Sequence, residues 1–122
     1  MKIRIKDNSV RFRLSKREVQ TLCTNGSISA RTEFNDAVFS YCIQVSEVHQ
    51  QLAAVFNGQT ITLFFPKQDA DTWYTNDIIT HKNIMTLQNG NTLSMLLEKD
   101  FVCLDHTDED QSDNYPNPNK TC

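Results

Sequence analysis

Five cationic side chains near the start of the chain have the types and the spacing to bind an anion. They alternate with apolar residues on two short runs, which supply Lys2, Arg4, Lys6, Arg11 and Arg13. Alternation with a period of two places such residues on one face of a strand. Arginine and lysine bind phosphate and carboxylate groups through charge-assisted hydrogen bonds. If the two runs share a face, one anionic group can reach several of these cations at once.

A β-hairpin over residues 1–14 would position these cations. The two runs are joined by Asp7-Asn8-Ser9, whose residue types are typical of a tight turn. The residues between the cations are apolar, and we expect them to be buried together: Ile3, Ile5, Val10, Phe12 and Leu14. The cations then form the opposite face, which we call the basic face.

Three interpretations of the basic face stay open. A charged alternating face is commonly the solvated side of a sheet. The cations can also pair within the molecule, with Glu98, Asp100 and Asp105 as counter-charge candidates. The third interpretation is an external partner, either an anionic small molecule or a protein. Nucleic acid fits less well, because Phe12 alternates away from the cations and the many acids of the chain repel a phosphate backbone.

The distribution of charge favours internal pairing as well as ligand binding. Seven of the twelve Lys and Arg residues lie within residues 2–17, and seven of the fifteen acids lie within 98–113, although the net charge is only −3. Oppositely charged ends of one chain can neutralise each other in the fold. We therefore predict a small binding or interaction module whose basic face is paired with, or gated by, the acidic C-terminal segment.

Metal binding and catalysis have weaker support in the sequence. Cys103, Asp105 and His106 offer half of a metal site, with ligand types that suit zinc or calcium, but a second half-site is not visible. The alternative to a binding module is a metal-dependent enzyme that processes anions or polyphosphates with the basic face and the pair Glu98 and Asp100. We assign no catalytic residue and expect no cofactor.

Composition predicts one domain, with residues 1–104 as the globular part and 105–122 as an acidic, partly disordered tail. The longest apolar runs are too short to span a membrane, and the strand-like, charged N-terminus does not resemble a signal peptide. The four cysteines are far apart in the sequence, which is typical of free thiols, so we expect a cytoplasmic protein. The oligomeric state is not specified by these patterns.

The remaining elements follow from local signals. Ser15-Lys16-Arg17-Glu18 has the spacing of a capping box and predicts a helix that ends at Asn25-Gly26. Apolar alternation predicts further hairpins over 27–45, over 52–65 around Asn57-Gly58, and over 78–101 around 89–91, with a short helix over 66–73 between the last two. This order predicts an α+β fold, mainly antiparallel β, in which hairpins and two short helices build a curved sheet or partly closed barrel.

Two terminal motifs are distinctive. The start K-I-R-I-K-x-N-S-x-R-x-R-L-S-K-x-E-V, together with L-L-E-K-D-F-x-C-L-D and the late run E-D-x-x-D-x-Y-P-N-P, resembles a small bacterial family of uncharacterised cytoplasmic proteins. The resemblance covers nearly the whole chain and implies no activity. It does imply that the basic beginning and the acidic end occur together.

Overall fold

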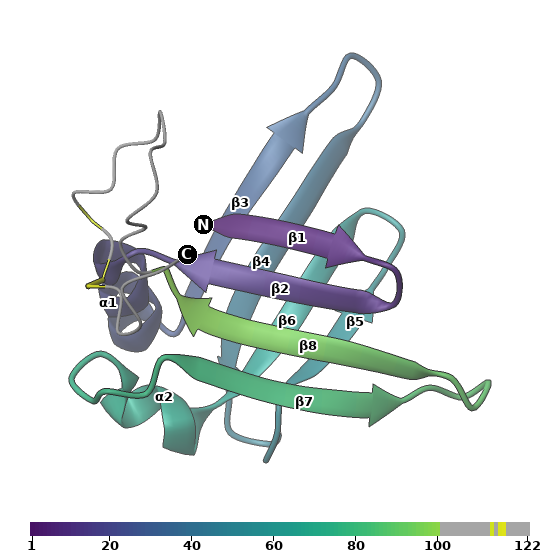
Figure 1. The fold of residues 1–122 in the computed structure, drawn as a ribbon. Coiled ribbons are helices and arrows are strands. Elements are labelled where there is room, and N and C mark those ends of the chain that lie inside the picture. Colours follow the sequence, from purple (N-terminus) through teal and green to yellow (C-terminus); the bar gives the residue numbers. More distant parts are fainter. Residues whose placement is uncertain (101–112, 114, 117–122) are drawn as a thin grey trace.

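Eight strands and two helices make up the computed structural model, which describes residues 1–100, 113, 115 and 116 (Figure 1). The elements in chain order are β1 (Lys2–Lys6), β2 (Ser9–Leu14), α1 (Lys16–Asn25), β3 (Ser27–Glu33), β4 (Val38–Ser46), β5 (Ala53–Phe56), β6 (Thr60–Pro66), α2 (Lys67–Trp73), β7 (Thr80–Thr86) and β8 (Thr92–Lys99). They form two four-stranded sheets, with strand orders β1-β2-β8-β7 and β3-β4-β6-β5.

Both sheets are built in the same way, from two hairpins that meet at a parallel pair. Sequential strands form the four antiparallel pairs, and β2 with β8 and β4 with β6 form the two parallel pairs. The predicted α+β fold, mainly antiparallel and built from hairpins with two short helices, is therefore confirmed. The two sheets are not closed into a barrel: each keeps two edge strands, and their apolar faces pack against each other.

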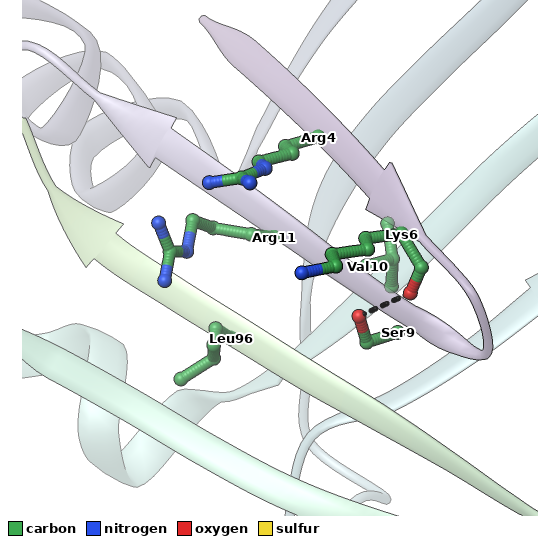
Figure 2. Close-up of a pocket in the computed structure, with 6 residues that line it drawn as sticks. All are labelled: Arg4, Lys6, Ser9, Val10, Arg11 and Leu96. Atoms are coloured by element: carbon green, nitrogen blue, oxygen red, sulfur yellow. Dashed lines mark hydrogen bonds between the residues drawn. The ribbon is translucent and has the colours of Figure 1, made fainter.

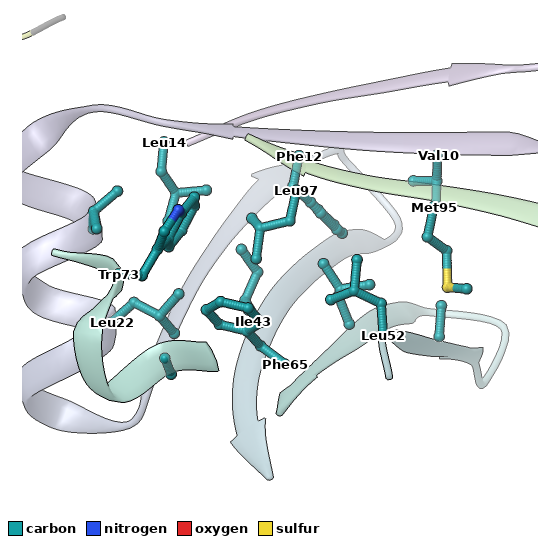
Figure 3. Close-up of a cluster of buried hydrophobic side chains, with 14 residues drawn as sticks. Val10, Phe12, Leu14, Leu22, Ile43, Leu52, Phe65, Trp73, Met95 and Leu97 are labelled. Carbon is teal, nitrogen blue, oxygen red and sulfur yellow. The ribbon is translucent and has the colours of Figure 1, made fainter. Parts of the chain in front are cut away.

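The core lies between the two sheets and is closed at one end by the helices (Figures 1 and 3). Phe12 and Leu97 of the first sheet face Ile43 and Phe65 of the second, and all four are fully buried. The helices add further buried side chains, namely Val19, Leu22, Ala70 and Trp73. Each large apolar side chain that is fully removed from water contributes about 1.5–3 kcal/mol to the free energy of unfolding. Burial of one face of the first sheet in this layer leaves its other face directed outward.

The predicted capping box is present at the start of α1. Ser15 Oγ accepts a hydrogen bond from Glu18 N at 3.3 Å, and Ser15 N donates to Glu18 Oε1 at 2.9 Å. The Glu18 carboxylate also pairs with the N-terminal amino group of Met1. The helix ends at Gly26, whose φ of 85° is left-handed and whose N–H donates to Leu22 O. The cap thus joins the start of β1 to the end of β2.

Ser15→Ala is expected to lower the free energy of unfolding by about 1 kcal/mol, because it leaves a helical N–H without its acceptor. Thermal unfolding should show a melting temperature lower by about 4 °C. Ser15→Asp is the control, since a carboxylate also accepts at this position. Equal melting temperatures for Ser15→Ala and the parent protein would contradict the assignment.

Two described residues beyond the last strand return to the end of the first sheet. Asp113 O accepts from Lys16 N at 3.1 Å, and Tyr115 N donates to Asp100 O at 2.8 Å. The Tyr115 ring packs against the core, and Lys99 Nζ lies 5.2 Å from its centroid. Burial raises the pKa of Tyr115 to about 12. These contacts hold Asp100, the last residue before the undescribed segment 101–112, beside the first sheet.

His81 titrates inside an aromatic cluster. Its ring centroid lies 4.9 Å from that of Phe65 and 5.2 Å from that of Trp73, and burial lowers its pKa, although Asp69 acts in the opposite direction and Lys99 in the same direction. The folded protein therefore keeps this imidazole neutral at pH values where the unfolded chain binds a proton. Proton uptake by the unfolded chain then destabilises the fold as the pH falls below about 6.5.

We expect the free energy of unfolding to drop between pH 7.5 and pH 5, and His81→Phe to remove part of that drop. Urea unfolding of both proteins at both pH values measures the difference, and the carboxylates common to both proteins cancel in the comparison. An identical drop in the two proteins would show that His81 does not contribute.

Candidate functional site

The register of the first sheet brings the five predicted cations to its outer face. Lys2 lies opposite Arg13 and Arg4 lies opposite Arg11 in the antiparallel pair of β1 and β2, while Lys6 lies opposite Ser9. The alternate residues of β2 point into the core, where Val10, Phe12 and Leu14 are buried. Because alternate residues of a strand face opposite sides, burial of one set fixes the other set on the outer face.

Two predicted counter-charges lie at one end of this face. Glu98 of β8 is the register partner of Arg13, and its Oε1 lies 2.9 Å from Arg13 Nε and 3.6 Å from Arg11 Nε. Asp100 Oδ2 lies 3.0 Å from Lys2 Nζ. Both acids are almost completely buried, at 8% and 6% exposure. At this end of the basic face the structure therefore supplies internal ion pairs.

The other end of the face holds Arg4 and Lys6, for which residues 1–100 supply no such acidic partner. Arg4, Lys6 and Arg11 line a hollow of about 210 Å³ together with Ser9, Val10 and Leu96 (Figure 2). Among the described residues, neither Arg4 nor Lys6 forms an ion pair. We call this feature the cationic hollow.

The side chains of the cationic hollow converge. In Figure 2 the guanidinium groups of Arg4 and Arg11 lie beside each other, and the Lys6 side chain extends along the same face. The Ser9 hydroxyl donates to Lys6 O at 2.7 Å, which closes the turn beneath them. Like charges that lie close together repel one another, and an anion between them removes the repulsion and accepts hydrogen bonds from both arginines. The volume is below the 300–1,000 Å³ typical of sites for drug-sized ligands, so it suits a compact anion.

Leu96 of β8 completes the hollow, and we did not predict it from the sequence. It alternates with the buried Met95 and Leu97, so the same period of two that placed the cations also places Leu96 on the outer face. That β8 lies beside β2, however, depends on a parallel pairing that local patterns do not reveal.

The candidate metal ligands Cys103, Asp105 and His106 lie outside the described residues. Within the described part of the chain, no group of three or more His, Cys, Asp or Glu side chains could hold a metal ion. Cys23 and Cys42 are free thiols, and burial raises the pKa of Cys23.

Comparison with known proteins supplies a family but not an activity. The model of a family of unknown function, DUF7009, matches residues 1–119. The chain belongs to this family. Its match includes both the basic face and the acidic segment, in line with the expected uncharacterised family. Neither a curated protein nor a solved structure matches the chain. Across the described residues, no helix has the length and apolar character needed to cross a membrane. A bacterial source and a cytoplasmic location stay predictions.

Proposed function

We propose that the protein is a small binding module that holds a compact anion, a phosphate or carboxylate group, in the cationic hollow. The observation that supports this most directly is the pairing of Arg4 with Arg11 across β1 and β2, with Lys6 beside them and without a counter-ion on Arg4 or Lys6 among the described residues. Two guanidinium groups and one ammonium group offer enough donors to bind several oxygens of one anion.

The internal ion pairs leave the hollow positive. Glu98 lies closer to Arg13 than to Arg11, and Asp100 pairs with Lys2, so both acids are engaged at the far end of the face. Arg11 is shared, since its head group both approaches Glu98 and lines the hollow. In this proposal Glu98 and Asp100 neutralise Arg13 and Lys2, and the positive charge that remains around the hollow attracts the ligand.

A binding role is favoured over the metal-dependent enzyme. Such an enzyme needs carboxylates that are free to hold a metal ion, whereas Glu98 and Asp100 are each paired with a cation and nearly buried. Gating of the basic face by the acidic C-terminal segment stays a prediction, because Asp105 lies outside the described residues.

Calorimetric titration of the full chain with inorganic phosphate and with tripolyphosphate tests the proposal. We expect Arg4→Gln to weaken binding about tenfold, because it removes a charge-assisted hydrogen bond of about 1.5 kcal/mol. Arg17→Gln is the matched control, because Arg17 is an exposed cation of α1 and does not line the hollow. Unchanged affinity in Arg4→Gln, or no binding by the parent protein at millimolar anion, would overturn the proposed function.

A further inference from the structure

β1 is an edge strand of the first sheet in the part of the chain that the structure describes. Among the described residues β1 pairs only with β2, and it stands first in the strand order of its sheet. An edge strand directs half of its backbone N–H and C=O groups away from the sheet, and extended peptides add to such edges as a further strand. The cations of β1 therefore border outward-facing backbone N–H and C=O groups that no other strand within residues 1–100 uses.

The two sides of this edge differ sharply in character. Arg4 and Lys6 project on the outer side, into the cationic hollow. On the inner side Ile5 is 57% exposed and lines an apolar groove of about 400 Å³ between the two sheets, together with Phe39, Phe56 and Leu93. Any strand added to β1 would thus meet positive charge on one side and apolar surface on the other.

We propose that β1 accepts an extended peptide of alternating acidic and apolar residues as a fifth strand of the first sheet. The acidic side chains would lie beside Arg4 and Lys6, and the apolar side chains would enter the groove beside Ile5. Residues two apart in a strand share a face, so acids at alternate positions match the spacing of Arg4 and Lys6. This inference rests on the proposed function, because it uses the same cations and specifies the molecule that carries the carboxylate.

Other occupants of the edge fit less well. A second copy of β1 would place cations opposite cations across the new strand pair, which is unfavourable. The edge strand β3 of the other sheet offers no comparable charge, since Arg31 is paired with Glu33 of the same strand at 3.0 Å. Cations on an edge strand also disfavour non-specific pairing with other strands. They favour a peptide that carries complementary negative charge.

Fluorescence anisotropy with the full chain and three labelled peptides tests this inference. The first peptide has eight residues that alternate glutamate and valine. The second has the same composition with the glutamates and valines in separate blocks. The third repeats the alternating sequence with N-methyl groups on alternate backbone nitrogens, which removes the donors of one edge and keeps the charge. We expect the alternating peptide to bind, and the N-methylated and block peptides to bind at least tenfold more weakly.

Variants locate the binding to β1. Arg4→Glu is expected to weaken the binding of the alternating peptide at least tenfold. Arg17→Glu, the same charge change at an exposed position of α1, is expected to weaken it less than twofold. Circular dichroism checks that each variant is folded. If Arg4→Glu is unfolded, the Arg4→Gln variant takes its place. Amide hydrogen exchange of the parent protein is then measured as well, and we expect the amides of β1 to be more protected when the peptide is bound.

The possible results separate this inference from the proposed function. Equal affinity for all three peptides would overturn the inference and leave a purely electrostatic anion site. Binding of phosphate without binding of any peptide would overturn it as well. Binding of the alternating peptide in an Arg4-dependent manner, without binding of phosphate or tripolyphosphate, would support the added strand and overturn the free compact anion as the ligand.

Discussion

Trp73→Ala is expected to lower the free energy of unfolding by about 3–5 kcal/mol, the range typical of removing a large buried aromatic ring. Trp73 is completely buried and joins several parts of the core. Its ring meets Phe65 edge to face at 5.3 Å between centroids, and its Nε1 donates to Ile78 O at 2.8 Å. Lys99 Nζ lies 5.7 Å from the same ring. Truncation leaves a cavity, an unpaired carbonyl and a buried ammonium group without this aromatic contact.

Urea unfolding followed by far-ultraviolet circular dichroism measures the effect. Trp73→Phe keeps most of the ring volume but loses the hydrogen bond to Ile78 O, so a smaller loss of about 1–2 kcal/mol is expected. Tyr74→Ala is the control from the next position, where the side chain is 44% exposed and little stability should be lost. A Trp73→Ala protein within about 1 kcal/mol of the parent would show that α2 is not an anchor of the fold.

Local sequence signals located most elements. The capping box at Ser15, the helix after Pro66 and the hairpin around Asn57-Gly58 are all present, because each depends on a few neighbouring residues. The Asn57 turn is longer than a two-residue connection: Phe56 lies opposite Ile61, and the Asn57 side chain accepts from Gln59 N and Thr60 N. Hairpin formation was therefore easier to predict than the geometry of the turn.

The joining of the hairpins could not be predicted in the same way. The parallel pair of β2 and β8 links Arg13 to Glu98 and the pair of β4 and β6 links Ile43 to Leu63, across stretches of chain that carry no local signal for each other. Apolar alternation is equally compatible with one curved sheet and with two packed sheets, since both bury one face of every strand. Only the long-range pairing distinguishes them.

The same limit applies to the candidate site. A period of two was sufficient to place five cations on one face, and the sequence also suggested Glu98 and Asp100 as counter-charges. Which cations the acids neutralise depends on the register of β8 against β2, which puts Glu98 beside Arg13 and leaves Arg4 outside the ion pairs of the described residues. Local patterns therefore identified the charged groups, and the long-range register selected the ones that form the hollow.

Glu98→Lys is expected to tighten the binding of phosphate about 30-fold at low ionic strength. A carboxylate about 8 Å from a bound monovalent anion repels it by about 1 kcal/mol at an effective dielectric constant of about 40, and a charge reversal doubles the change to about 2 kcal/mol. Glu98→Gln, which only neutralises the group, should give about a fivefold gain. In the parent protein Glu98 Oε1 lies 3.6 Å from Arg11 Nε, so Glu98 competes with the ligand for the Arg11 guanidinium group. Both variants remove this competition.

Calorimetric titration of the parent protein and both variants with phosphate measures the gain, and added salt of about 0.5 M should reduce it by screening. Asp36→Lys is the control, because it makes the same change in net charge at an exposed loop position of the second sheet. The variants also separate the two roles of Glu98. In Glu98→Lys the introduced ammonium group would face Arg13 in the register of β2 and β8, so this variant should lose stability while it gains affinity. If Asp36→Lys gains as much affinity as Glu98→Lys, the anion responds to net charge and not to the cationic hollow.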